Sequence, residues 1–250
     1  MKRLAGVLPQ SLILILGIAV AHDSGAADGQ VEINQLCVAT GCFAGDSPGF
    51  PVQISNPGSY ILTSNLEVPD NQIGIELNGS GITLDLGGHA ILGPVECTGP
   101  GPSCAGFNSG PIYGISPSPA LLTLGDTTIR NGTVSGFFVD CVRLAGFGGA
   151  FGILIQDLHV SNCGGDGIGI GGYATIESVT VRNAFGHGIE SASVGTIVRD
   201  SVFYNNGEFG VNGANCSANI FADNGDATGV GEENCGNHID DSICNGSICP

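Results

Sequence analysis

The chain has 250 residues, with 43 glycines, ten cysteines, no tryptophan and a formal net charge of −17. Nucleic acids and anionic membrane surfaces are bound by clustered Lys and Arg, and six such residues against 23 acidic ones argue against both partners. Only 12% of the residues are charged and 42% are hydrophobic, whereas disordered chains are depleted in apolar residues. This composition favours short buried strands joined by tight turns.

The N-terminus (residues 1–21) is typical of an export signal peptide. Lys2 and Arg3 precede an apolar run over residues 12–20, and small residues follow it. We expect cleavage at the end of this segment or after Ala27, because the apolar run is too short to span a bilayer comfortably. The alternative is a retained membrane anchor. A cleaved chain is expected to be secreted, without membrane insertion.

Residues 28–58 are expected to cap the N-terminal end of the fold. Residues 31–38 predict a short strand or a short helix, and the prolines and glycines after them prevent any long element. Cys37 and Cys42 lie five residues apart around Gly41, so we expect them to form a local disulfide.

From residue 59 onward, short runs of alternating apolar and polar residues are punctuated by Gly or Asn. Residues 74–77 and 82–86 show this period of two most clearly, which predicts β-strands. Residues 94–119 contain six prolines and are expected to form a protruding loop with a Cys97–Cys104 disulfide. Such a loop either carries functional residues or is an extended turn that has no role in function.

A repeat of about 20 residues organises residues 59–235. Asn162, Asn183, Asn205 and Asn224 are each followed five residues later by a glycine and an aliphatic residue. The steps between these asparagines are 21, 22 and 19 residues, a period typical of a solenoid. Counted along the chain, with Cys141 replacing one glycine, this pair occurs at Gly74-Ile75, Gly114-Ile115, Cys141-Val142, Gly167-Ile168, Gly188-Ile189, Gly210-Val211 and Gly229-Val230.

The repeat predicts an all-β fold, a single-stranded right-handed parallel β-helix (solenoid) of about seven coils. Coils stacked about 4.8 Å apart would pair every backbone group with the coil above and below. The recurring asparagines are expected at sharp bends, because Asn tolerates a left-handed backbone and its amide can bond to the same amide one coil away. The alternative is that they stand in surface turns and form no ladder.

The same register predicts a disulfide between Cys216 and Cys235. Each lies six residues after the glycine of its coil, Gly210 and Gly229. The two cysteines therefore stack on adjacent coils, at a Cα separation that suits a disulfide.

Four cysteines remain for two further disulfides. Cys244 and Cys249 are close in sequence and are expected to pair within a C-terminal tail, residues 236–250. Cys141 and Cys163 are then left to pair with each other, although the register does not align them.

Three motifs point to a known fold family: Gly-Ser-Tyr-Ile-Leu-Thr-Ser-Asn-Leu over residues 58–66, Gly-Ile-Thr-Leu-Asp-Leu-Gly-Gly-His over residues 81–89, and Cys-x4-Cys-Pro over residues 244–250. With them, the chain resembles secreted bacterial right-handed parallel β-helix repeat proteins of the pectate-lyase-like superfamily, over roughly residues 59–235. The resemblance implies the fold more specifically than any chemistry. Its members include polysaccharide lyases, glycoside hydrolases, epimerases, phage tailspikes and surface proteins without known activity.

Lyases of this superfamily generally hold Ca²⁺ with several carboxylates on the exposed sheet and use an arginine as base. Here the outward position after each glycine-plus-aliphatic pair lacks an acidic cluster. Arg143 and Glu190 are expected two coils apart with Gly169 between them, so a sugar ring can rest there. Asp166 and His187 fall on adjacent coils and would form an acid–base pair if they face one groove. The alternative is a solvated aspartate and an unrelated histidine.

Ca²⁺ is the one cofactor that the resemblance suggests. Five acidic residues near the C-terminus could supply oxygen ligands, but they lack the fixed spacing of a calcium loop and favour a charged cap. They are Asp226, Glu232, Glu233, Asp240 and Asp241.

The sequence thus predicts a secreted β-helix protein that binds extracellular polysaccharide or serves as a surface module. The alternative is a polysaccharide lyase, glycoside hydrolase or epimerase that acts on an acidic polysaccharide. Its candidate catalytic residues are Arg143, Asp166, His187 and Glu190.

Overall fold

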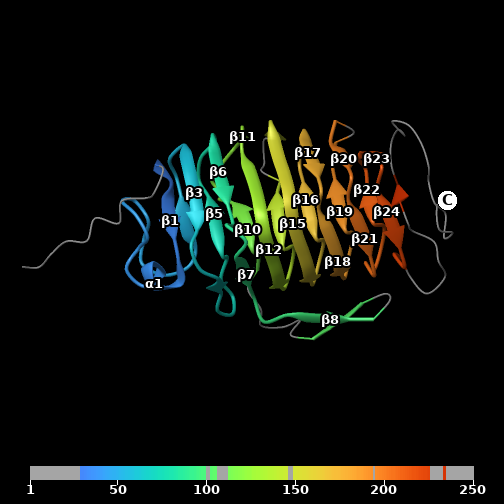
Figure 1. The fold of residues 1–250 in the computed structure, drawn as a ribbon, viewed down its shortest axis with the longest axis horizontal. Coiled ribbons are helices and arrows are strands. Elements are labelled where there is room, and N and C mark those ends of the chain that lie inside the picture. The colour runs from blue at the N-terminus through green and yellow to red at the C-terminus, as the bar shows by residue number, and fades with distance from the viewer. Residues whose placement is uncertain are drawn as a thin grey trace, which may run out of the picture.

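The computed structural model describes residues 29–99, 102–105, 112–145, 149–193 and 195–225, and the backbone of residues 233–234. These residues form a parallel β-solenoid whose strands stack side by side along the long axis (Figure 1). The predicted all-β class and solenoid architecture are confirmed. The predicted signal peptide and the C-terminal tail with Cys244 and Cys249 lie outside the described residues.

The larger sheet follows two sides of the solenoid and has 13 strands within the described residues. Its first side consists of β1 (Val31–Ile33), β3 (Gly58–Leu62), β6 (Ile82–Asp85), β12 (Thr128–Phe137), β15 (Ile153–Cys163), β17 (Ala174–Glu177), β20 (Ile197–Arg199) and β23 (Asn215–Ser217). The long strands β12 and β15 pair on both sides and join the two. The second side adds β4 (Leu66–Glu67), β7 (Ala90–Leu92), β18 (Thr180–Ala184), β21 (Val202–Tyr204) and β24 (Ile220–Ala222).

A second sheet of eight parallel strands forms another side of the solenoid. Its strands are β2 (Val52–Ile54), β5 (Ile75–Leu77), β10 (Ile115–Pro117), β13 (Val142–Leu144), β16 (Ile168–Ile170), β19 (Ile189–Ser191), β22 (Val211–Asn212) and β25 (Glu233–Asn234). Six of them begin at the aliphatic residue of a predicted glycine-plus-aliphatic pair, from Ile75 to Val211. The seventh predicted position is wrong, because Val211 pairs with Glu233 and not with Val230.

The aliphatic residue of each pair points inward and stacks on its equivalent in the next coil. Ile75, Ile115, Val142, Ile168 and Ile189 are aligned by the strand register and are fully buried. Burial of each such side chain contributes about 1.5–3 kcal/mol. These columns form the hydrophobic core, which runs through the interior of the solenoid.

The predicted asparagines stand at a bend of the chain with a left-handed backbone. Asn162, Asn183 and Asn205 have φ angles of 57°, 54° and 54°. The side-chain amide of Asn183 donates to Oδ1 of Asn162 at 3.5 Å, which is a step of the expected ladder. Asn tolerates this conformation better than most residues, and this explains its recurrence.

Asn224 was expected in the same column and does not lie in it. The register places Asp223 there, with a φ of 52°, because Tyr204 pairs with Ala222. Asn224 lies one position further along, where it is 3% exposed and its Oδ1 accepts a hydrogen bond from Nδ2 of the buried Asn206 at 2.8 Å. The coil between Asn205 and Asp223 is therefore one residue shorter than the spacing from Asn205 to Asn224. Aspartate can occupy the bend because it tolerates a left-handed backbone as asparagine does.

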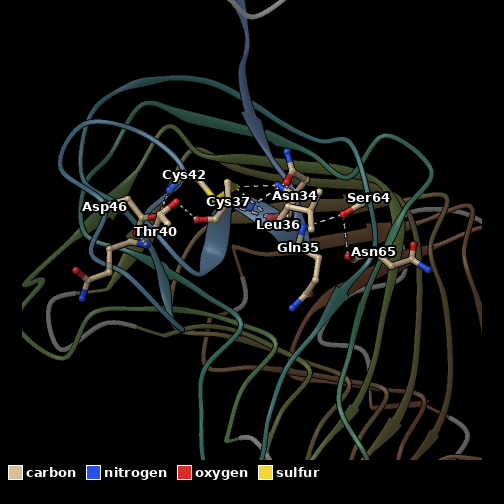
Figure 2. Close-up of a disulfide and its surroundings, with 10 residues drawn as sticks. Asn34, Gln35, Leu36, Cys37, Thr40, Cys42, Asp46, Ser64 and Asn65 are labelled. Atoms are coloured by element: carbon tan, nitrogen blue, oxygen red, sulfur yellow. Dashed lines mark hydrogen bonds between the residues drawn. A yellow bond between two sulfur atoms is a disulfide. The ribbon is translucent and has the colours of Figure 1, made fainter. Parts of the chain in front are cut away.

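The N-terminal segment closes the first coil with both elements that were considered for it, β1 followed by α1 (Gln35–Val38). Figure 2 shows Asn34 capping this helix: its Oδ1 accepts the N–H groups of Leu36 and Cys37 at 3.1 and 3.0 Å. The adjacent Cys37–Cys42 disulfide forms. The carboxylate of Asp46 accepts the N–H of Cys42 at 2.8 Å and that of Gln53 in β2 at 2.9 Å. The cap is therefore fastened to the solenoid.

Parts of the segment predicted to form a protruding loop, residues 94–119, are regular structure. Its last part belongs to the second sheet as β10, and β8 (Glu96–Thr98) and β9 (Ser103–Ala105) form an antiparallel hairpin with a Cys97–Cys104 disulfide. Figure 1 shows β8 running alongside the solenoid, where the hairpin contacts β15 and β18. Cys97 is 2% exposed and Cys104 is half-buried, so the hairpin turns its disulfide toward the solenoid.

A third disulfide joins Cys141 to Cys163 across a Cα distance of 5.5 Å. Cys216 is also disulfide-bonded, and its predicted partner Cys235 lies outside the described residues. Disulfides persist mainly in oxidising compartments, so they are consistent with an extracellular protein. No helix in the described part of the chain has the length and apolar character needed to cross a membrane.

Candidate functional site

The exposed face of the second sheet presents one outward side chain per coil. The strand register aligns Arg143 with Gly169 and Gly169 with Glu190, as the repeat predicts. Gly169 has no side chain and is buried: a Cβ atom there would come within 3.3 Å of Oδ2 of Asp140 and 3.9 Å of Cγ of Arg143. Arg143 and Glu190 lie two strands apart, about 10 Å. We call this line the outer row: Gln53, Glu76, Ser116, Arg143, Gly169, Glu190 and Asn212.

At the turn that leads into this sheet, a second line of residues stacks from coil to coil. We call it the turn column: Tyr113, Asp140, Asp166, His187 and Phe209. Oδ1 of Asp140 accepts the backbone N–H of Asp166 at 2.9 Å, and Oδ1 of Asp166 accepts the N–H of His187 at 2.8 Å. Nδ1 of His187 accepts the N–H of Phe209 at 3.1 Å. Three of these side chains thus satisfy a backbone donor of the next coil and stabilise the stacking: Asp140, Asp166 and His187.

His187 is held between two glutamates. Its Nδ1 acts as an acceptor toward the backbone N–H of Phe209 at 3.1 Å. Nε2 lies 2.9 Å from Oε2 of Glu208 and 3.4 Å from Oε2 of Glu190. The ring also stacks on Phe209, with centroids 5.6 Å apart. Nε2 is therefore a donor in this arrangement, and neither ring nitrogen is free to act as a base.

Asp166 has the most perturbed acidity in the cluster. Burial raises the pKa of its carboxyl to about 6, and the negative charges of Asp140 and Glu190 add to this rise. The hydrogen bond from the N–H of His187 and the charge of that ring act in the opposite direction on the same pKa. A group that exchanges its proton near pH 6 suits acid–base chemistry.

Arg143 is anchored by a buried carboxylate. Its Nη1 lies 2.8 Å from Oδ2 of Asp140, whose side chain is only 4% exposed. Burial alone would lower the pKa of Arg143, but the hydrogen bond and charge of Asp140 raise it, so the guanidinium stays charged. Its Cζ lies 5.8 Å from the centroid of the Tyr113 ring, within reach of a cation–π contact. The side chain remains 43% exposed, so part of its donor set faces solvent.

A cavity of about 430 Å³ opens beside Arg143 on the same face. Tyr113 and Arg143 form one part of its wall, and Ser116 adds a polar group from the outer row. The rest of the wall is mostly apolar and consists of Ile73, Pro117, Pro119 and Ala145, and Ser118 adds a second hydroxyl. Mostly apolar concave sites with a few polar groups are typical of small-ligand binding. We call this cavity the groove.

The four predicted catalytic residues fall into one neighbourhood but do not converge as a set. Asp140 links Arg143 to the backbone of Asp166. His187 and Glu190 lie together on the coil after that of Asp166, two coils after that of Arg143. Among the hydrogen bonds of the described residues, the carboxylate of Asp166 meets His187 through its backbone N–H and not through its ring. The contact between Asp166 and His187 therefore holds two coils together and does not join the carboxylate to the imidazole ring.

Three residues complete this cluster that were not among the predicted site residues. Asp140 lies in the turn column and could have been found by counting, because it precedes Cys141 as Asp166 precedes Gly167. Asn212 donates to Oε2 of Glu190 at 2.6 Å, and Glu208 contacts His187. The position of Asn212 follows the register, but no repeated position predicts the contact of Glu208.

No metal site is formed by the residues that the structure describes, in the sense of three or more His, Cys, Asp or Glu side chains suitably grouped. The acidic side chains near the C-terminus that were considered for Ca²⁺ lie outside the described residues. Binding of Ca²⁺ stays a prediction.

Neither the protein-family models, nor the curated proteins, nor the solved structures that were searched yielded a match to the chain.

Proposed function

We propose that the protein is a secreted, non-catalytic module that binds extracellular polysaccharide on the exposed face of the second sheet. The observation that carries the proposal is the groove beside Arg143, which combines an aromatic ring, a partly free guanidinium and a hydroxyl. Aromatic faces and polar donors are the groups that sugar rings contact. The outer row continues from this groove past Gly169, which has no side chain, to Glu190, so an extended chain has a path along the sheet.

The proposal of binding without catalysis is supported by how the candidate catalytic groups are used. Asp166 and His187 each use an acceptor atom to bind a backbone N–H of the next coil. Arg143 is paired with Asp140, and Glu190 accepts from Asn212. Groups held in this way are suited to a rigid surface, whereas a general base needs a free lone pair in its reactive state. Secretion is supported by the export-type N-terminus and the disulfides.

A second candidate function is an enzyme that acts on an acidic polysaccharide through the same face. One observation favours it: the carboxyl of Asp166 has a pKa raised to about 6 by burial and neighbouring charges, near the range at which a general acid or base works best. In this case Arg143 would bind a sugar carboxylate with the donors that Asp140 leaves free.

A polysaccharide screen with and without Ca²⁺ separates the two functions. The wild-type chain is tested against neutral and uronic-acid polymers by affinity electrophoresis, and product release is followed by reducing-end and unsaturated-uronate assays. Binding without product supports the module, and turnover that Asp166→Asn abolishes supports the enzyme. We expect Arg143→Ala to weaken binding about tenfold or more, from the loss of charge-assisted hydrogen bonds. Arg182→Ala, an exposed arginine of β18, is the matched control. A wild-type chain that binds no polymer contradicts the proposal.

A further inference from the structure

Two aromatic side chains lie exposed on a different edge of the solenoid, where the chain passes from the second sheet into the larger one. Phe151 in β14 (Ala150–Phe151) is 48% exposed, and Tyr173 in the next coil is 64% exposed. β14 pairs with β11 (Leu124–Gly125), which is labelled at the upper edge of the solenoid in Figure 1. Both rings lie outside the groove and outside the outer row.

Each ring lies across a glycine of a neighbouring coil. Gly125 pairs with Phe151, and a Cβ atom added to Gly125 would come within 2.5 Å of Cζ of Phe151. On the other side, a Cβ atom on Gly195 would come within 2.1 Å of Cδ1 of Tyr173. Glycine at positions 125 and 195 therefore leaves room for each ring to pack flat against the backbone of the neighbouring coil. Each ring therefore covers its neighbouring coil and does not project into solvent.

The four residues form one continuous strip. Phe151 is one coil after Gly125, the N–H of Tyr173 bonds to O of Ala150 at 2.8 Å, and the pairing of Thr175 with Ile197 sets Tyr173 level with Gly195. Consecutive coils about 4.8 Å apart give the strip a length of about 14 Å. Phe151 leans toward one end and Tyr173 toward the other. We call Gly125, Phe151, Tyr173 and Gly195 the aromatic strip.

The strip is too small for a stable protein interface. Two aromatic side chains of about 150–250 Å² each, half to two-thirds exposed, offer roughly 200 Å² of apolar surface. A stable protein partner needs about 800 Å² on each side. A narrow strip of flat rings fits a linear polymer better than it fits a second copy of the chain.

The charges around the strip exclude an anionic ligand. The strip contains no arginine or lysine, and the exposed Asp126 lies beside Phe151, with its N–H bonded to O of Phe151 at 3.0 Å. The net charge of the chain is −17. A carboxylate or sulfate group would be repelled here. The carboxylate of Asp126 can instead accept hydrogen bonds from hydroxyl groups.

We propose that the aromatic strip is a binding site for a neutral, linear polysaccharide whose sugar rings stack on Phe151 and Tyr173. The C–H groups on the flat face of a pyranose ring meet the negative face of an aromatic ring, and the hydroxyl groups at its rim reach Asp126. This site is separate from the groove and does not rest on the function proposed for that face.

The test is affinity electrophoresis through gels that contain hydroxyethylcellulose, glucomannan, a soluble β-1,3-glucan or polygalacturonate. We expect at least one neutral polymer to retard the wild-type chain, and the double variant Phe151→Ala/Tyr173→Ala to bind about tenfold or more weakly. Leu122→Ala, which removes another exposed apolar side chain, is the matched control and should bind as the wild type does. If Arg143→Ala abolishes the retardation and the double variant does not, the neutral polymer binds in the groove and the proposal is overturned.

Gly195→Ala tests the ring orientation while both rings are kept. The new methyl group displaces the ring of Tyr173, which can rotate away, so folding should persist while binding weakens. Circular dichroism melts establish that every variant is folded. The proposal is overturned if no neutral polymer retards the wild type, or if the double variant binds as the wild type does. It is also overturned if sedimentation shows a dimer that the double variant dissociates, since a second copy would then occupy the strip.

Discussion

The carboxylate of Asp140 bridges two residues of the candidate site: its Oδ2 pairs with Nη1 of Arg143 at 2.8 Å, and its Oδ1 accepts the N–H of Asp166 at 2.9 Å. The first contact orients the guanidinium that borders the groove, and the second fixes the stacking of two coils. The orientation of Arg143 and the stacking of two coils therefore depend on one buried side chain, which is 3% exposed. The same relationship explains why carboxylates recur in the turn column without forming a metal site.

Replacement of Asp140 by Ala should destabilise the fold and release Arg143. The backbone N–H of Asp166 would be left without its acceptor, and Arg143 would lose its partner, for a loss of about 2–4 kcal/mol in the free energy of unfolding. Urea unfolding followed by circular dichroism measures this loss. Asp140→Asn keeps Oδ1 as an acceptor and should retain more of the stability. Equal stability of Asp140→Ala and the wild type would contradict the bridging role.

The pH dependence of stability should reveal the raised pKa of Asp166. Burial raises this pKa to about 6 in the folded state, above the value of about 3.9 for an unfolded aspartate. The folded state therefore binds the proton more tightly, and Asp166 lowers stability as the pH rises from about 4 through 6. Asp166→Asn keeps an oxygen acceptor for His187 but carries no charge.

We therefore expect Asp166→Asn to raise the urea midpoint relative to the wild type at pH 7.5, and this advantage to shrink at pH 4.5. The comparison at each pH removes the contribution of the other acidic residues, which both chains share. If the difference between the two chains is the same at both pH values, the carboxyl of Asp166 does not have the raised pKa.

The repeat in the sequence predicted the second sheet well because one physical requirement recurs in every coil. A tight turn must be followed by an inward aliphatic residue, and Ile115, Val142 and Ile168 meet this requirement at their predicted positions. The same reasoning failed at Asn224, because Asp223 tolerates the left-handed bend as well as an asparagine does. A spacing alone does not distinguish two adjacent residues that both suit the bend.

The groove and the packing of the β8–β9 hairpin could not be predicted in this way. Both depend on where side chains outside the repeat come to lie, such as Tyr113 against Arg143 and Cys97 against the second side of the larger sheet. Likewise, Gly125 and Gly195 look like ordinary turn glycines in the sequence. Their role under Phe151 and Tyr173 appears only once the coils are stacked.

The left-handed bend at Asn183 gives a direct test of the asparagine column. Asn183→Ala places a β-carbon in a strained conformation and removes the bond to Asn162, so we expect a loss of about 1–2 kcal/mol. Asn183→Gly also loses the bond but relieves the backbone strain, so it should be the more stable of the two. The two urea-unfolding curves check this order, and the reverse order would contradict the conformational explanation.

The partner of Cys216 stays a prediction from the sequence. Cys216 is disulfide-bonded, and it lies on β23 at the end of the solenoid, aligned with Val198 of the preceding coil. Six other cysteines cannot be its partner, because they pair among themselves: Cys37 with Cys42, Cys97 with Cys104, and Cys141 with Cys163. Cys235, Cys244 and Cys249 remain. Because Glu233 and not Val230 pairs with Val211, the register no longer aligns Cys235 with Cys216, but Cys235 directly follows β25 and is the nearest of the three along the chain.

Non-reducing peptide mapping after cleavage at acidic residues should therefore recover a peptide that joins Cys216 to Cys235. The double variant Cys216→Ser/Cys235→Ser should lose about 3 kcal/mol of stability, since a closed loop of this length restricts the unfolded chain. Cys244→Ser/Cys249→Ser is the matched control and should change stability less, because it closes a much shorter loop. A recovered link from Cys216 to Cys244 or Cys249 would contradict this pairing.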